Sequence, residues 1–104
     1  MSNAPISEQY RLAALEWVPL DAAARLLEET KTTVLSTKMK ALGDLPAAHA
    51  ERDVKASPEW REFIETMVQA RTKANKAKLQ LEWLRMRFNE WQSLEASKRA
   101  EMRL

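Results

Sequence analysis

The run of residues between Arg71 and Arg87 has the residue types and spacing that could recognise a charged partner. It contains one acidic residue, Glu82, and six basic ones. The basic residues are Arg71, Lys73, Lys76, Lys78, Arg85 and Arg87. This run carries a net charge of +5, whereas the whole chain carries only +2. Because basic side chains neutralise phosphates and Trp83 could stack on a base, the run predicts a nucleic-acid contact.

An alternative is that the same basic side chains are paired within the protein. Arg71, Lys78 and Arg85 recur every seven residues, so on a helix they share one face. Positions beside a helix–helix seam are commonly basic and pair with acids of the neighbouring helix. The acids expected opposite this run are Glu16, Asp21, Glu28 and Glu29. An acidic protein partner is a third interpretation of the run.

The sequence shows no arrangement of residues that indicates catalysis. His49, the only histidine, is followed by Glu51 and Asp53, but one imidazole with two carboxylates is a weak metal-binding pattern, so we interpret it as a surface histidine. The absence of cysteine excludes a thiolate site, and a single glycine cannot form a phosphate-binding loop. We therefore predict a protein that is not an enzyme and has no cofactor, metal or small-molecule substrate.

The basic run lies inside one long helix that the sequence predicts over residues 58–102. Apolar residues alternate at three- and four-residue spacing along it: Trp60, Phe63, Met67, Ala70, Ala74, Ala77, Leu81, Leu84, Phe88 and Trp91. This heptad pattern is typical of a helix that packs along another helix. Ser57 as the capping residue and Pro58 in the first turn give a clear start.

Another long helix is predicted over residues 7–42, with Ser7 as its cap and Gly43 after its end. Pro19 lies in its interior, where proline removes a backbone hydrogen bond at a cost of about 3 kcal/mol. We therefore expect this helix to be kinked or broken near Pro19. The two parts should stay roughly collinear, since apolar residues lie on both sides. These are Leu12, Leu15, Trp17, Leu20, Ala23, Leu27, Val34 and Leu42.

The two long helices predict an all-α fold, a coiled-coil-like antiparallel hairpin that forms one domain over residues 1–104. Residues 43–57 connect them and contain a short helical turn between Pro46 and Val54. In the expected register, the numbers of facing residues add up to roughly 100. Ala74 then lies near Leu27, in a stretch of small residues that allows the helices to approach closely.

Leu79, Trp83 and Met86 form a second apolar stripe on the long helix, outside the seam. These three residues are called the outer stripe. In a single hairpin they would face solvent, and an exposed apolar patch of this kind is a candidate interface. We predict self-association into a helical bundle, with a dimer as the simplest case. The alternatives are cover by the first helix or by residues 1–15, and a foreign protein partner.

The composition predicts a soluble cytoplasmic protein. Of the 104 residues, 31% are charged, and no apolar run approaches the roughly 20 residues that a membrane span needs. The first residues lack the basic and apolar regions of a secretory signal.

In size and hairpin layout the chain resembles secreted Trp-x-Gly hairpin proteins, but no tryptophan stands two residues before Gly43, the only glycine. In size, charge and scarcity of glycine it is similar to small helical proteins of phages and prophages. We predict a non-catalytic helical interaction protein that self-associates and binds a macromolecular partner. One alternative is a nucleic-acid-binding accessory protein of phage or prophage type that uses residues 71–87. The other is a small inhibitor or chaperone that docks on a host protein.

Overall fold

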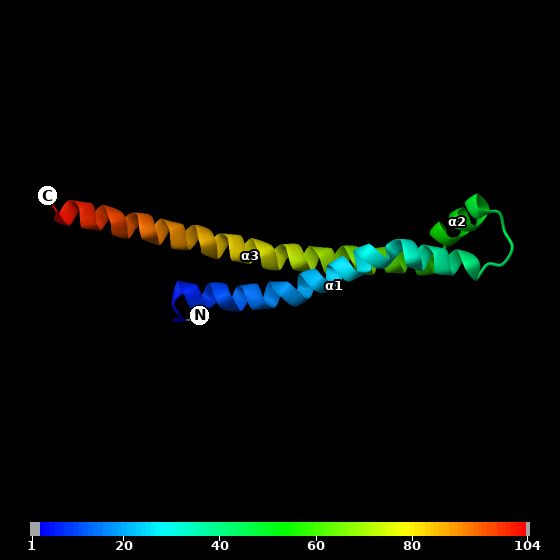
Figure 1. Cartoon of the computed structure of the whole chain (residues 1–104), viewed down its shortest axis with the longest axis horizontal. Helices are drawn as coiled ribbons and strands as arrows, with labels where there is room; N and C mark the ends of the chain where they lie inside the picture. Colours follow the sequence, from blue (N-terminus) through cyan, green and yellow to red (C-terminus); the bar gives the residue numbers. More distant parts are fainter. Residues whose placement is uncertain (1–2, 104) are drawn as a thin grey trace.

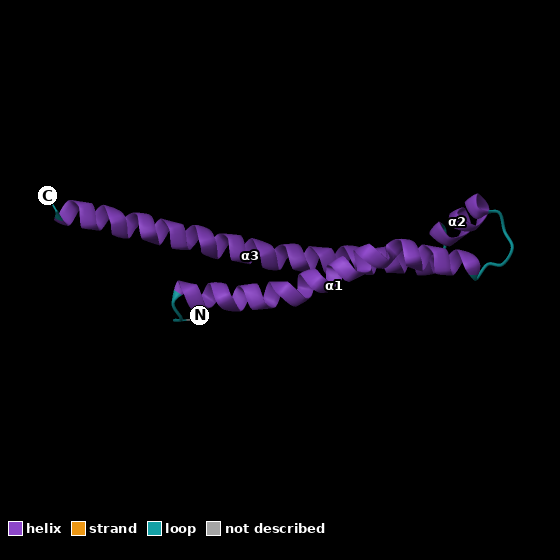
Figure 2. Ribbon diagram, viewed as in Figure 1, coloured by secondary structure: helices purple, strands orange, loops and turns teal. Residues whose placement is uncertain are grey.

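The computed structural model describes residues 3–103, and its described part contains three helices and no strand (Figure 2). Helix α1 spans Ile6–Lys40, α2 spans Ala47–Lys55 and α3 spans Pro58–Met102. The two long helices lie antiparallel and form an extended hairpin of 82 × 24 × 17 Å, with α2 at its closed end (Figure 1). The predicted all-α hairpin is confirmed.

Helix α1 begins without the cap that the sequence predicted at Ser7. The helix starts one residue earlier, at Ile6, and Pro5 occupies the capping position. The carbonyl of Pro5 accepts the backbone amides of Glu8 and Gln9, both at 3.0 Å. Because this carbonyl takes the amide of Glu8 as well, the donor that a side-chain cap would satisfy is already bonded.

Helix α1 is not broken at Pro19, since one helix contains this residue in its interior. Proline has no N–H, so the carbonyl of Leu15 loses its usual backbone donor. Both residues are exposed, which leaves that carbonyl accessible to water. Figure 1 shows that the first part of α1, in dark blue, and the rest of the helix run in different directions.

The connection between the long helices follows the prediction closely. Helix α1 ends at Lys40, two residues before its predicted end, and Gly43 turns the chain with a φ of +87°, a conformation that favours glycine. Helix α2 forms in the predicted short helical stretch. The Oγ of Ser57 accepts the amide of Trp60 at 3.2 Å and donates to the carbonyl of Val54 at 2.6 Å. Ser57 therefore caps α3, as predicted, and ties it to the end of α2.

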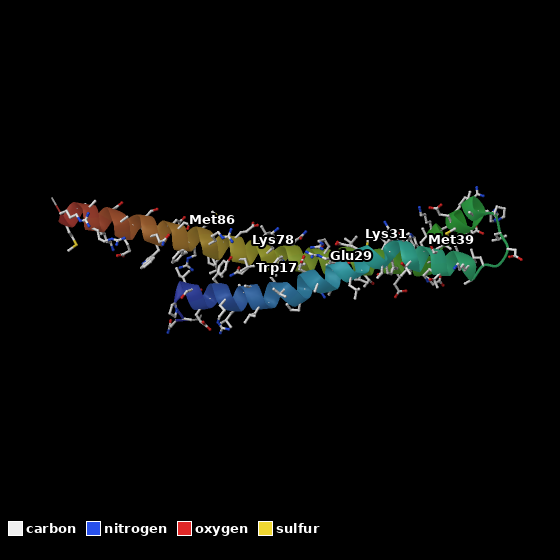
Figure 3. All side chains as sticks on the ribbon, viewed as in Figure 1. Trp17, Glu29, Lys31, Met39, Lys78 and Met86 are labelled. Carbon is white, nitrogen blue, oxygen red and sulfur yellow. The ribbon has the colours of Figure 1, made fainter. Side chains whose placement is uncertain are left out.

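The buried residues form a thin line rather than a broad core. They are Ala13, Ala24, Ala50, Val54, Trp60, Ala74, Leu81 and Leu84. Ala24 and Ala74 are fully buried, in agreement with the predicted close approach of α1 and α3 at mid-hairpin. Toward the open end, Ala13, Leu81 and Leu84 cluster, and Trp17 packs against them between the two helices (Figure 3).

At mid-hairpin the register agrees with the predicted one, since Arg71 contacts Glu28, and it departs from the prediction toward the open end. Arg85 contacts Tyr10, whereas the predicted register placed it beside Leu15. The apolar face of α1 also differs from the expected set, since Leu12 and Leu15 are exposed and Ala13 is buried.

Helix α3 is longer than α1, with 45 residues against 35, and extends alone beyond the start of α1 (Figure 1). Ile6, at the start of α1, lines a crevice together with Phe88. The segment Phe88–Met102, here called the overhang, meets only the first residues of α1 and extends beyond them. As a result Phe88 and Trp91, the last two predicted seam residues, are exposed.

Among the described residues, no helix combines the length and the apolar character that crossing a membrane requires.

Candidate functional site

The outer stripe lies open on α3. The exposed fractions are 63% for Leu79, 49% for Trp83 and 60% for Met86. Figure 3 places Met86 on the edge of α3 that faces away from α1. Neither α1 nor the described residues before it cover the stripe, so cover by the first helix or by residues 3–15 does not account for it.

Trp83 also carries a cation on its ring. The guanidinium carbon of Arg87, four residues later, lies 5.0 Å from the ring centroid. A cation over an indole face is attracted by the ring quadrupole. This contact holds Arg87 beside the outer stripe, so an apolar surface and a positive charge lie next to each other.

Arg71, by contrast, is engaged by α1. Its Nε and Nη2 donate to the two carboxylate oxygens of Glu28, at 2.8 and 2.7 Å. Its Nη1 donates to Oδ1 of Asp21 at 2.8 Å. Asp21 also accepts from Arg25 at 3.0 Å. These bonds join the two long helices. At Arg71, they agree with the interpretation that the basic run pairs with acids of the neighbouring helix.

Arg85 is also tied to α1, through a different group. Its Nη2 donates to the hydroxyl oxygen of Tyr10 at 3.0 Å, and this bond raises the pKa of the arginine. Lys78, one turn before Leu81, is exposed and lies close enough to Asp21 to help lower the pKa of that carboxyl. The face that carries Arg71, Lys78 and Arg85 is thus the one directed to the acids and the tyrosine of α1.

The remaining bases lie on the other side of α3. Lys73, Lys76 and Gln80 line an open groove with Glu16 and Leu20 of α1. Within residues 3–103, neither lysine has a carboxylate within ion-pair distance, even though Glu16 borders the same groove. Lys73, Lys76 and Arg87 are here called the basic ridge, because they stand unpaired by acids along one side of α3.

Of the four acids predicted to lie opposite the basic run, only two form ion pairs with it in the described residues. Asp21 and Glu28 both bind Arg71, whereas Glu16 borders the groove without an ion pair. Glu29 is exposed and pairs with no described residue of α3. The structure thus divides the six bases into those that hold the hairpin together and those that stay available.

The Arg71 cluster predicts acid sensitivity of the hairpin. Hydrogen bonds from Arg71 lower the pKa of both Asp21 and Glu28. A lowered folded-state pKa stabilises the fold fully above the unfolded pKa values of roughly 4, and this stabilisation is lost as the pH falls through the folded values. We expect the thermal midpoint of unfolding, measured by circular dichroism, to decrease when the pH is lowered below about 4. In Arg71→Met the same change of pH should decrease the midpoint less.

A matched control for this experiment is Arg61→Met. Among the described residues, Arg61 forms an ion pair only with Glu65 of its own helix, at 3.2 Å, so its removal should leave the acid sensitivity unchanged. Equal loss of thermal midpoint on acidification in the parent and in Arg71→Met would show that the cluster does not cause the pH dependence.

His49 lies on α2 in a local pair. Its Nε2 is 3.2 Å from Oδ2 of Asp53, and Nη2 of Arg52 lies 3.4 Å from its Nδ1. In the part of the chain that the structure describes, no three histidine, cysteine or acidic side chains are placed to hold a metal ion.

Comparison with protein-family models, curated proteins and solved structures gives no match. The surfaces of α3 therefore have to be interpreted from their own geometry and charge.

Sequence reasoning missed two features of this site. It did not separate the paired bases from the basic ridge, although positions 73, 76, 80, 83 and 87 alternate at three- and four-residue spacing and so share a side of the helix. It also did not point to the overhang, although the predicted helices of 36 and 45 residues already implied that one would extend past the other.

Proposed function

We propose that this protein is a non-catalytic helical interaction protein that self-associates through the outer stripe and binds a macromolecular partner. The observation that carries the proposal is the exposure of Leu79, Trp83 and Met86, each about half or more open to solvent on one face of α3. A contiguous exposed set of leucine, tryptophan and methionine is typical of interfaces.

The small core of the hairpin supports self-association. Of the described residues buried in this fold, four are alanines, and Leu84 is the largest side chain that is fully buried. Small scaffolds without disulfides or structural metals commonly gain stability by oligomerising. Pairing of two outer stripes about a two-fold axis would bury the same three residues of each copy and give a four-helix bundle.

Light scattering of the parent protein over a series of concentrations tests the proposal. We expect the mass to rise with concentration above the 12.0 kDa of one chain, to twice that value or more. A mass that stays at one chain up to the highest soluble concentration would contradict self-association.

Nucleic-acid binding is a second candidate function, supported by the basic ridge. Lys73 and Lys76 lack an acidic partner among the described residues, and Arg87 lies over Trp83. Free cations beside an exposed indole can contact phosphates while the ring stacks on an unpaired base. Because Arg71 and Arg85 join the two helices, the candidate nucleic-acid contact lies on the basic ridge rather than on the whole basic run.

Replacing Lys73, Lys76 and Arg87 together by glutamine is expected to weaken binding of a single-stranded oligonucleotide. The slope of log binding constant against log salt should become shallower by about two, because three phosphate contacts to a single strand are lost. Fluorescence anisotropy at several salt concentrations measures this slope.

The control replaces three exposed bases away from the ridge, Lys31, Lys40 and Arg61, by glutamine. It should change the slope less than the ridge variant does. Equal effects of the two triple variants, or no binding by the parent at low salt, would count against a nucleic-acid site on the ridge.

A further inference from the structure

The overhang repeats the pattern of the seam without having a partner. Leu81 and Leu84 of the seam are buried against α1, and the same three- and four-residue spacing continues through Phe88, Trp91, Glu95, Lys98 and Met102. Trp91 and Met102 are 52% and 85% exposed. From Trp91 onward the overhang thus offers, in continuity with an interface that the hairpin already uses, a helix face with Trp91 and Met102 at its ends and two opposite charges between them.

When two copies of this segment lie antiparallel, this order of residues brings complementary side chains together. In an antiparallel pair of identical helices, alternate seam positions meet symmetrically. If Glu95 lies beside the partner's Lys98, then Lys98 lies beside the partner's Glu95, and Trp91 lies beside the partner's Met102. Both charges then find an opposite charge, and both large apolar side chains find each other.

The position of α1 determines how far two overhangs can overlap. Ile6 and Ser7 line a crevice with Phe88 and Trp91, so α1 occupies the seam from Phe88 onward toward the closed end. A register with one heptad more of overlap would place the partner's Met102 over Leu84, which α1 already covers. The register that pairs Glu95 with the partner's Lys98 is therefore the deepest that leaves α1 in place.

The crevice at the start of α1 adds a seat for the partner's helix end. Pro5, Ile6, Phe88 and Trp91 give it a mainly apolar lining, and its volume of about 320 Å³ is large enough for a methionine side chain. The partner's Met102, placed beside Trp91 by the register, lies at the mouth of this crevice.

We propose that the overhang pairs antiparallel with the overhang of a second copy of this chain, with Glu95 beside the partner's Lys98 and Trp91 beside the partner's Met102. This inference rests on the proposed self-association but adds a contact on a different face of α3. It joins two hairpins end to end, whereas the outer stripe joins them side by side.

The experiment compares four proteins that all carry Trp83→Glu, so that the outer stripe does not contribute. Light scattering should show a dimer for Trp83→Glu alone. Addition of either Glu95→Lys or Lys98→Glu should raise the dissociation constant at least about ten-fold, because like charges then face each other across the contact. Glu90→Lys, an exposed acid outside the seam, is the matched control and should leave the dimer intact.

An equimolar mixture of the Glu95→Lys and Lys98→Glu proteins should restore the dimer. One chain then has two lysines and the other two glutamates, so every contact between chains joins opposite charges. Within each chain the two positions still carry like charges, although the parent pairs Lys98 with Glu95 at 3.8 Å. Restoration of the dimer would therefore show pairing between chains, because mixing does not change the like charges at positions 95 and 98 within each chain.

The outcomes separate this inference from the proposed function. If Trp83→Glu is a monomer while the parent is a dimer, the outer stripe is supported and pairing of overhangs is wrong. If Trp83→Glu keeps the parent mass and the mixture restores the dimer, the overhang is supported and the side-by-side contact is wrong. A dimer that neither charge reversal weakens, or a mixture that stays monomeric, overturns the proposal.

Discussion

Leu84→Ala is expected to lower the free energy of unfolding by about 2–5 kcal/mol, the range found when a buried leucine is truncated. Leu84 is 2% exposed and is the largest fully buried side chain in the part of the chain that the structure describes, in the cluster with Ala13 and Leu81. In a line of contacts this thin, few neighbours can close the space that its removal leaves. For a domain of this size, the loss should lower the thermal midpoint by at least about 10 °C.

Thermal unfolding followed by circular dichroism measures this loss, with all proteins at one concentration because self-association adds to stability. Leu26→Ala is the matched control. Leu26 is exposed on α1 and lies outside the outer stripe and the overhang, so its truncation should change the free energy of unfolding by no more than about 0.5 kcal/mol. Similar losses for the two variants would show that the cluster around Leu84 does not dominate the stability of the hairpin.

Trp83→Glu, introduced into the Glu95→Lys protein, is expected to convert a side-by-side dimer into a monomer. The Glu95→Lys change removes the contact between overhangs, so the outer stripe alone holds the two copies together. A glutamate at its centre would bring two negative charges together in an apolar interface, at a cost of several kcal/mol. Sedimentation equilibrium of the two proteins measures the change in mass.

The control for this test is Leu26→Glu in the same Glu95→Lys protein. It also replaces an exposed apolar residue by glutamate, but on α1 and outside the outer stripe. We expect it to leave the dimer unchanged. If Glu95→Lys alone is already monomeric, or if Leu26→Glu dissociates the dimer as strongly as Trp83→Glu does, the outer stripe is not the surface that joins the hairpins.

The parts of the fold that the sequence predicted well are those controlled by local chemistry. Ser57 and Pro58 give α3 both its cap and its first turn within a few residues, so the start of this helix needed no tertiary information. The start of α1 was wrong because two local signals compete there. Pro5 and Ser7 can each begin a helix, and the rigid backbone of proline prevails.

The register between α1 and α3 could be read only in part from the heptad pattern. The heptad pattern was right about the pairing at mid-hairpin, where Arg71 contacts Glu28, but it did not show that Arg85 would lie beside Tyr10. The contacts that select the observed register involve polar groups far apart in the sequence, such as Arg71 with Asp21 and Glu28, and Arg85 with Tyr10. For the same reason, the sequence could not say which bases are engaged by α1 and which remain in the basic ridge.

The unusual length of the hairpin affects how this protein behaves in flow and diffusion. Its radius of gyration is 23.0 Å, which a compact globular protein reaches only at about 480 residues. A single hairpin should therefore tumble and diffuse more slowly than a compact globule of its mass and leave a gel-filtration column earlier than that globule. Early elution is thus a property of the rod itself, and X-ray scattering should give a distance distribution with a long tail for one chain as well as for two.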